Sequence, residues 1–209
     1  MQPEASCPRC AGPVRPPDLW SSAWRCERHG EVLPNYLLPR ACADALTHLL
    51  DVTSVPVWLP WPLPHGWLVT GLGYAGDERT GARATLVACS GPAPLGGGAD
   101  LLLIAEDPGI GLGARYAGLP GPDPGDGVGA GPPYAVVKAV GHDTPLWNVP
   151  AATECAAFVG EAKGLWLWAL LWPAAADVLL LEDLRLCDLR DGEPGAALEF
   201  GAAPPLLHR

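Results

Sequence analysis

Lysine is almost absent from this chain of 209 residues, and its scarcity excludes one large class of nucleotide-binding sites. The only two lysines are Lys138 and Lys163, and neither stands in a Gly-x-x-x-x-Gly-Lys run. A P-loop needs that run because its lysine reaches the phosphates of the nucleotide. Ser90 likewise lacks the flanking glycines of a hydrolase nucleophile elbow. We therefore assign no catalytic residue from the sequence.

Positive charge as a whole is scarce. The chain has 13 lysines and arginines against 23 aspartates and glutamates, which leaves a formal net charge of −10. Residues 1–40 are near +1 and residues 41–209 are near −11. An acidic body repels phosphate backbones. The charge therefore argues against nucleic acid as a partner.

Long uninterrupted hydrophobic runs are also missing. The longest apolar stretch, residues 164–181, contains Pro173 and Asp177, and an adjacent pair of acids follows it directly. Charges at these positions are poorly placed for lipid. We expect no membrane span here, but two buried strands, residues 164–172 and 178–189, joined by a Pro-Ala turn.

The beginning of the chain shows no signal-peptide pattern, because residues 1–6 are polar and a cysteine pair follows at once. The seven cysteines are an odd number and only three of them cluster, whereas a disulfide framework normally pairs them all. Both features predict a cytoplasmic protein.

The three clustered cysteines and one histidine form the strongest pattern in the sequence. Cys7 and Cys10 are separated by two residues, and so are Cys26 and His29. Two such pairs at this distance predict a structural zinc site, because each tight turn presents two ligands on one side and two turns close a tetrahedron. A peptide this small cannot bury enough apolar area to fold alone. Zinc binding, at about 10–16 kcal/mol in comparable peptides, offsets that deficit.

Other interpretations of these cysteines stay open. The first pair could be a redox motif, but that motif needs a strand before it and a helix after it. The cysteines could be unrelated core residues, or Cys42 could replace His29 as the fourth ligand. We also expect Trp20 and Trp24 to cover the site or to contact the rest of the chain.

The chain divides into a zinc-ribbon-like head, residues 1–38, and a Trp-rich body, residues 39–209. We predict an α+β body with a mainly antiparallel or mixed sheet and two or three helices, because short apolar runs alternate with many turn residues. We expect helices over residues 39–50 and 153–162, and strands over residues 55–61 (a sheet edge or a wall), 66–74, 82–90, 101–106 (central and buried on both faces) and 134–140. We also expect a long loop over residues 118–133 and a loosely ordered tail from residue 192.

Two weaker signals lie in the body. Gly109, Gly111 and Gly113 follow a strand, and such a turn can let a phosphate approach backbone N–H groups, with Arg115 and either Arg79 or Arg83 as further anion contacts. A tight turn is the simpler interpretation. Separately, Trp166, Trp168 and Trp172 share one face of a strand, so they form either a heavy core or a binding surface, and we favour the core.

The first cysteine turn reads Cys7-Pro-Arg-Cys10-Ala-Gly12, and the second ends in His29. It resembles the zinc-ribbon superfamily, in which Cys-Pro-x-Cys-Gly is usual and the fourth ligand is more often cysteine. The stretches VPVWLPWPLP (55–64), ACSGP (88–92), GLGARYAG (111–118), GPDPG (121–125) and GLWLW (164–168) extend the likeness over nearly the whole chain. Together they resemble an actinobacterial family of zinc-ribbon-headed proteins without an established function. Some members carry a phosphotransacetylase label, which implies an acyl-transfer enzyme as an alternative.

The leading functional hypothesis is a non-catalytic protein-interaction or regulatory module that contains structural zinc. The alternative is an enzyme acting on an acyl-CoA, an acyl phosphate or another phosphorylated small molecule. In the alternative, the turn at residues 109–113 and Arg115 would bind the anionic part of the substrate.

Overall fold

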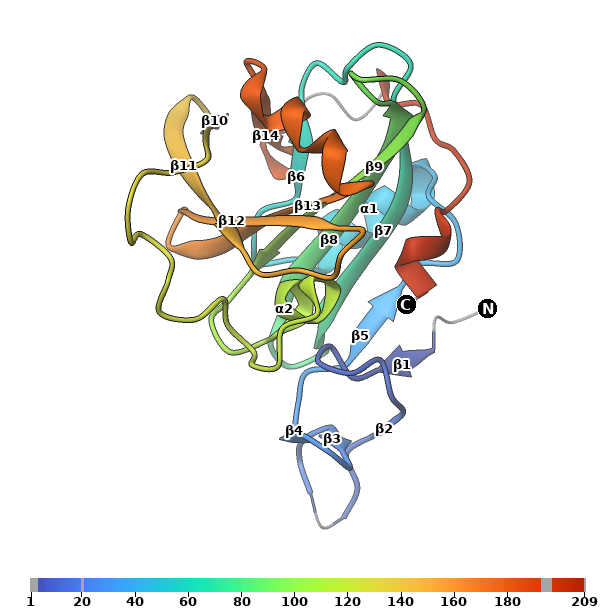
Figure 1. Cartoon of the computed structure of the whole chain (residues 1–209). Helices are drawn as coiled ribbons and strands as arrows, with labels where there is room; N and C mark the ends of the chain where they lie inside the picture. The colour runs from blue at the N-terminus through green and yellow to red at the C-terminus, as the bar shows by residue number, and fades with distance from the viewer. Residues whose placement is uncertain (1–3, 20, 193–196, 209) are drawn as a thin grey trace.

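The computed structural model describes residues 4–19, 21–192 and 197–208. The chain has an α+β fold with a large mixed sheet, as the sequence predicts (Figure 1). The strands of the head are β1 (Ala5–Ser6), β2 (Val14–Arg15), β3 (Arg25–Cys26), β4 (Gly30–Glu31) and β5 (Asn35–Leu37). The body contains α1 (Ala43–Val52), β6 (Trp58–Pro60), β7 (Leu68–Asp77), β8 (Gly81–Pro92), β9 (Gly98–Glu106), α2 (Leu112–Ala117), β10 (Ala135–Ala139), β11 (His142–Val149), β12 (Ala156–Ala162), β13 (Leu165–Trp172), β14 (Arg185–Asp188) and the 3-10 helices η1 (Ala174–Leu181), η2 (Leu189–Asp191) and η4 (Pro205–His208).

The large sheet has the strand order β1-β5-β7-β8-β9-β13-β12-β11-β10-β14-β6. All neighbouring strands are antiparallel except β10 and β14, which are parallel. Strand β9 lies in the interior of the sheet between β8 and β13, and residues 101–106 are all buried. The continuous apolar run that ends at Glu106 reflects this position, since both of its faces are covered.

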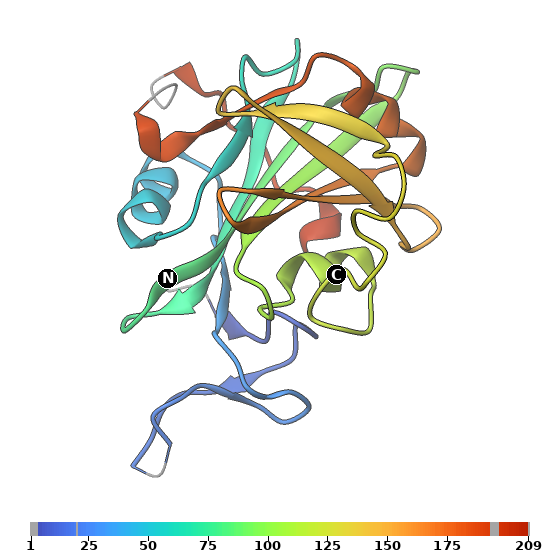
Figure 2. The ribbon, with the colours of Figure 1, turned by 90° about the vertical axis from the view of Figure 1, so that its left-hand side faces the viewer.

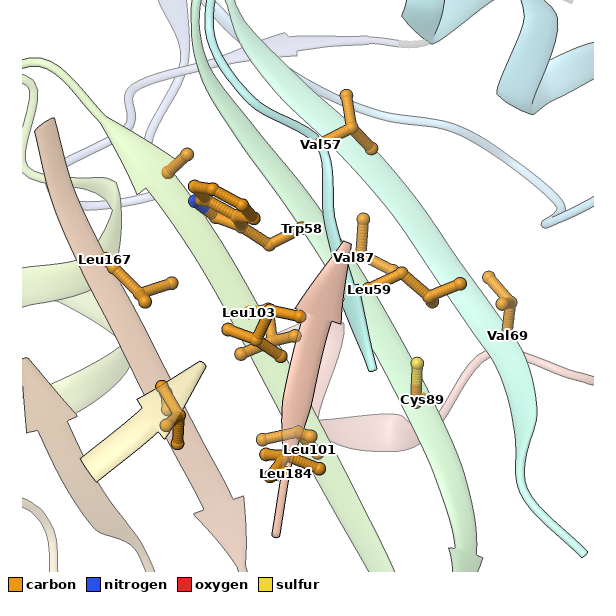
Figure 3. Close-up of a cluster of buried hydrophobic side chains, with 14 of the residues drawn as sticks. Val57, Trp58, Leu59, Val69, Val87, Cys89, Leu101, Leu103, Leu167 and Leu184 are labelled. Carbon is orange, nitrogen blue, oxygen red and sulfur yellow. The ribbon is translucent and has the colours of Figure 1, made fainter. Parts of the chain in front are cut away.

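The sheet curls so that β14 and β6 lie across one face of β8 and β9 (Figure 1). Trp58 and Leu59 of β6 are thereby buried among Val87, Leu101 and Leu103 from the strands beneath them (Figure 3). Strand β6 pairs with β14 and lies at the end of the strand order, which suits a segment rich in proline. The prediction of an edge strand is confirmed.

The opposite face of the central strands is covered by α2 and the C-terminal segment, which lie side by side (Figure 2). The hydroxyl of Tyr116 in α2 donates a hydrogen bond of 3.1 Å to the carbonyl of Leu207. Trp168 is fully buried under α2, while Trp166 and Trp172 are half-buried on the same face. The three tryptophans therefore share one face, and the central one belongs to the core.

An ionic cluster fastens the curled end of the sheet to the body. The Asp188 carboxylate, with a fully buried side chain, accepts hydrogen bonds from Lys163 (2.9 Å), from Arg190 (2.7 Å) and from the backbone N–H of Val57 (3.1 Å). It thus joins β14, the turn between β12 and β13, and the segment before β6. Burial acts to raise the pKa of Asp188, but these donors outweigh it and lower the pKa to about 2.

Three sequence predictions of local structure were wrong. Residues 153–162 are not a helix, because residues 156–162 form the strand β12 between β11 and β13. Residues 178–189 are not a single strand paired with residues 164–172: η1 comes first, and the short β14 then pairs with β10 and β6. The tail is not loosely ordered where it is described, since Leu206 and Leu207 are buried. In each case long-range packing overrides the local pattern.

Other predicted elements are present. The first helix begins at Ala43, four residues later than expected, and the strand pair β7 and β8 is antiparallel as predicted. Residues 118–133 form a loop without helix or strand. Within the described ranges, the model contains no helix of sufficient length and apolarity to span a bilayer.

Candidate metal centre

The four predicted ligands lie on two turns of the head. Cys7 and Cys10 belong to the turn between β1 and β2, which is closed by hydrogen bonds from the Cys7 N–H to the Gly12 carbonyl (2.8 Å) and from the Ala11 N–H to the Cys7 carbonyl (2.9 Å). Cys26 ends β3, and His29 lies in the turn that leads into β4. The small sheet β2-β3-β4 holds the second turn against the first.

The structure brings all four side chains together. Their ligand atoms lie within 4.8 Å of one another, and His29 faces the thiols through Nδ1. The Cys10–Cys26 sulfur distance is 3.7 Å, and His29 Nδ1 lies 3.7 Å from Cys26 Sγ and 3.4 Å from Cys7 Sγ. Metal–sulfur bonds of about 2.3 Å in a tetrahedron place sulfurs roughly 3.8 Å apart. The cluster therefore fits one tetrahedral metal ion.

The thiols differ in acidity. Burial raises the pKa of the Cys7 thiol to about 12. Burial also acts to raise the pKa of Cys26, but the backbone N–H groups of Arg28 and His29, together with the His29 ring, lower it to about 6. Cys26 therefore forms a thiolate more readily than Cys7, and a metal ion must displace the proton of Cys7 when it binds.

The first cysteine turn departs from the usual Cys-Pro-x-Cys-Gly pattern at Ala11. Ala11 stands where the glycine is usual, and it has a left-handed backbone with φ of 56°. A Cβ atom on the following Gly12 would lie 3.3 Å from the Cys10 sulfur. Ala11 therefore adopts a left-handed conformation that glycine tolerates more readily, at the cost of strain.

The competing ligand does not join the cluster. Cys42 precedes α1 as its N-cap and lies outside the Cys7, Cys10, Cys26 and His29 group. Trp24 is half-buried and lines a groove between the head and the body. Trp20 lies outside the described residues.

Arg9, inside the first cysteine turn, connects the metal cluster to the body. Its guanidinium donates to the carbonyls of Gly109 and Ile110, which belong to the glycine-rich turn before α2. A second link runs from the Arg79 guanidinium to the carbonyl of Ser22, over 2.8 Å. The head is therefore attached to the body at the turn that the sequence marks as a possible anion site.

Three backbone N–H groups of this turn already have carboxylate partners. The Glu106 carboxylate accepts from Leu112 N (2.7 Å) and Gly113 N (3.2 Å), and the Asp123 carboxylate accepts from Gly109 N (2.8 Å). Glu106 is completely buried, and burial raises its pKa to about 8. These amides are satisfied within the protein and are not available to a phosphate.

Backbone conformation and close packing explain why glycine stands at positions 109, 111 and 113 of this turn. Gly109 and Gly111 both have φ of 87°, the left-handed region that glycine tolerates. A Cβ at Gly111 would lie 2.9 Å from Cγ of Arg9, and one at Gly113 would lie 2.4 Å from the ring of Trp168. Gly111 therefore leaves room for Arg9 of the head, and Gly113 leaves room for Trp168 of the core.

The arginines that the sequence suggested as anion contacts do not meet at one site. Arg79 binds the head, and Arg83 pairs with Asp107. Arg115 instead lines a cavity beside the cysteine turn, together with Cys10 and Ala11. Sequence reasoning missed Glu106 as the residue that holds the start of α2, although an acid at the end of a fully apolar strand was a visible signal.

The fold and the cluster define a class: a small Cys₃His head with the ribbon arrangement, attached to a curled mixed sheet. The chain belongs to DUF6758, a family of unknown function whose model matches residues 1–207. This is consistent with the resemblance of nearly the whole chain to a family without an established function. Searches of curated proteins and of solved structures gave no match.

Proposed function

We propose that the cluster binds one Zn²⁺ ion with a structural role. Three thiolates and an imidazole suit zinc, and four protein ligands leave no position for a reacting water. The ion would hold the two turns together and so fix Arg9 against the body. The close fit of the four ligand atoms to a tetrahedron carries this proposal.

Metal content of the purified chain tests the zinc proposal. Mass spectrometry should find one zinc per chain, and Cys26→Ser should abolish it. Cys42→Ser is the matched control, because Cys42 lies outside the cluster. Zinc retained in Cys26→Ser, or lost in Cys42→Ser, would contradict the assigned ligand set.

We further propose that the protein is a non-catalytic interaction module whose head contacts a protein partner. Strands β2, β3 and β4 project from the body (Figure 1), and the loop between β2 and β3 carries Leu19, which is 98% exposed. Leu19 is the most exposed large apolar side chain among the described residues, which makes it the first candidate for contact with another molecule. The engaged amides of the glycine-rich turn also support this proposal over a phosphate-binding enzyme.

Affinity capture from lysate of the native host tests this role. The wild-type chain should retain a defined protein that Leu19→Asp does not retain. Leu95→Asp is the control, because Leu95 is an exposed leucine (73%) in the turn between β8 and β9. Equal capture by Leu19→Asp, or consumption of acetyl-CoA or acetyl phosphate by the purified protein, would contradict the proposal.

A further inference from the structure

A cavity of about 250 Å³ lies where the first cysteine turn meets α2. Its walls are mostly apolar, and the residues that line it are Cys10, Ala11, Arg115, Tyr116, Gly118, Ala152, Trp172 and Leu206. Arg115 is the only cation among these lining residues. Head, α2, the end of β13 and the C-terminal segment all contribute, so the cavity exists only in the complete fold.

Two donors of the Arg115 guanidinium lack acceptors. Among the described residues, the buried Nε and Nη2 atoms make no hydrogen bond, and the contact of the guanidinium is with Tyr116, whose ring centre lies 4.2 Å from Cζ. A ring face offers partial compensation, but it leaves the donors in the guanidinium plane unsatisfied. Buried donors without acceptors are rare in folded proteins and are costly, especially on a charged group.

The two unpaired atoms lie on one edge of the guanidinium, the edge that binds carboxylates. Elsewhere in this chain the same pair of atoms is used in this way: Nε and Nη2 of Arg185 donate to Asp183, and those of Arg190 donate to Asp188. Nε and Nη2 of Arg115 give up no hydrogen bond to a described residue when this edge turns toward a ligand in the cavity.

We propose that the cavity binds a small apolar monocarboxylate, with its carboxylate on Nε and Nη2 of Arg115 and its apolar part among Ala152, Trp172 and Leu206. A parallel pair of N–H donors matches the two oxygens of a carboxylate. At about 30 Å³ for each water-sized group, the cavity volume suits a ligand of roughly eight non-hydrogen atoms.

The surrounding charge disfavours a phosphate in the same place. With zinc bound, three thiolates and a neutral histidine give the metal site a net charge of −1, and Cys10 of that site is part of the cavity wall. The charge of Arg115 compensates one negative charge on a ligand, so a phosphate dianion would keep one negative charge uncompensated. The cavity is therefore selective for monoanions that have an apolar end.

Isothermal titration calorimetry on the zinc-loaded full chain tests the proposal with hexanoate, its uncharged analogue hexanamide, and inorganic phosphate. Hexanoate should bind saturably with one site per chain. Hexanamide and phosphate should bind at least about tenfold more weakly, because each loses the charge-assisted pair or the apolar contact. Binding of hexanamide or phosphate as tight as that of hexanoate, or no saturable binding of hexanoate, would overturn the proposal.

Variants locate the site. Arg115→Met should weaken hexanoate binding at least about tenfold, while Arg185→Met, which removes an exposed arginine of β14, should leave it unchanged. Hexanoate should quench tryptophan fluorescence in the wild type, and this quenching should disappear in Trp172→Phe. The fluorescence measurement replaces the Arg115→Met titration if that variant does not fold. Unchanged binding in Arg115→Met, or unchanged quenching in Trp172→Phe, would place the carboxylate elsewhere.

Discussion

At the scale of single residues, Ala11 stores strain in the metal-binding turn. Its φ of 56° is a conformation that costs an L-residue about 1–2 kcal/mol relative to the ordinary helical region. Ala11→Gly should therefore stabilise the turn by about 1 kcal/mol, after the larger unfolded-state entropy of glycine is subtracted. In competition with a colorimetric zinc chelator, Ala11→Gly should lose zinc more slowly or less completely than the wild type. Faster loss would mean that the alanine methyl group contributes packing that outweighs the strain.

Glu106 is a second residue with a consequence that can be measured. Burial raises its pKa in the folded protein to about 8, from an ordinary value of 4.5. Between these values the folded chain keeps a proton that the unfolded chain has lost, so stability is fully present below pH 4.5 and falls as the pH rises through 8. Urea unfolding should show a loss on the order of 2 kcal/mol between pH 6 and pH 8.5.

Glu106→Gln should remove this slope, because an amide does not titrate. Glu182→Gln is the control, since Glu182 is exposed and its replacement should leave the slope as in the wild type. A slope that persists in Glu106→Gln would assign the pH dependence to another group.

At the scale of elements, Arg9 attaches the head to the turn before α2. It donates to the carbonyls of Gly109 and Ile110, and no other described side chain makes these hydrogen bonds. Arg9→Ala should cost about 2 kcal/mol, because a charged donor is lost and two carbonyls are left without it. Hydrogen exchange should rise in residues 7–12 and 109–113 together.

Arg15→Ala provides the comparison for Arg9. Arg15 forms an exposed ion pair with Glu27 within the head, and such pairs contribute little. Exchange at residues 109–113 should match the wild type in this variant. Equal changes in both variants would show that loss of positive charge on the head, and not the contact at the turn, is responsible.

The curled end of the sheet depends on Asp188, which joins three elements through Val57, Lys163 and Arg190. Asp188→Asn leaves two partly exposed cations beside an uncharged group, and the loss of these charge-assisted hydrogen bonds should cost about 1.5–3 kcal/mol. Thermal unfolding should show a clear fall in Tm. Asp183→Asn, which affects only an exposed pair with Arg185, should change Tm little.

At the scale of the whole molecule, the two parts of the chain have different sources of stability. The body buries a large apolar core on both faces of its central strands, whereas the part of the head outside the large sheet has one small sheet of three two-residue strands and the Cys₃His group. Removal of the metal by a strong chelator should therefore unfold the head and leave the body folded.

Hydrogen exchange with mass spectrometry checks the effect of metal removal. Protection should be lost in residues 5–31 and kept in β8, β9 and β13. Restoration of zinc should restore the protection. Cooperative loss of protection in the central strands would instead show that the head and the body fold as one unit.

The sequence allowed good predictions where a pattern is local. The two-residue spacing of Cys7–Cys10 and Cys26–His29 predicted which side chains converge, because a tight turn orients its own ligands. The apolar run ending at Glu106 predicted a buried central strand, and the prolines around Trp58 predicted an edge strand. Each of these features depends on neighbours along the chain.

The sequence failed where the partner of a segment is distant. Residues 156–162 are compatible with a helix in isolation, but they fill the space between β11 and β13. The buried leucines of the C-terminal segment cover α2, a contact across about ninety residues that no local pattern encodes. For glycines 109, 111 and 113 the sequence left two interpretations, a tight turn and an anion-binding turn. The carboxylates of Glu106 and Asp123, which bind amides of this turn, favour the tight turn, the simpler of the two.

The candidate metal ligands, the acidic balance of charge and the α+β class follow from the chain alone, because spacing, charge and apolar period are properties of the sequence. The contact of Arg9 with the glycine-rich turn and the lack of acceptors for Nε and Nη2 of Arg115 among the described residues are visible only in the folded chain. The physical reason is that hydrogen bonds and burial depend on which distant segments meet, and that meeting is set by the packing of the whole sheet.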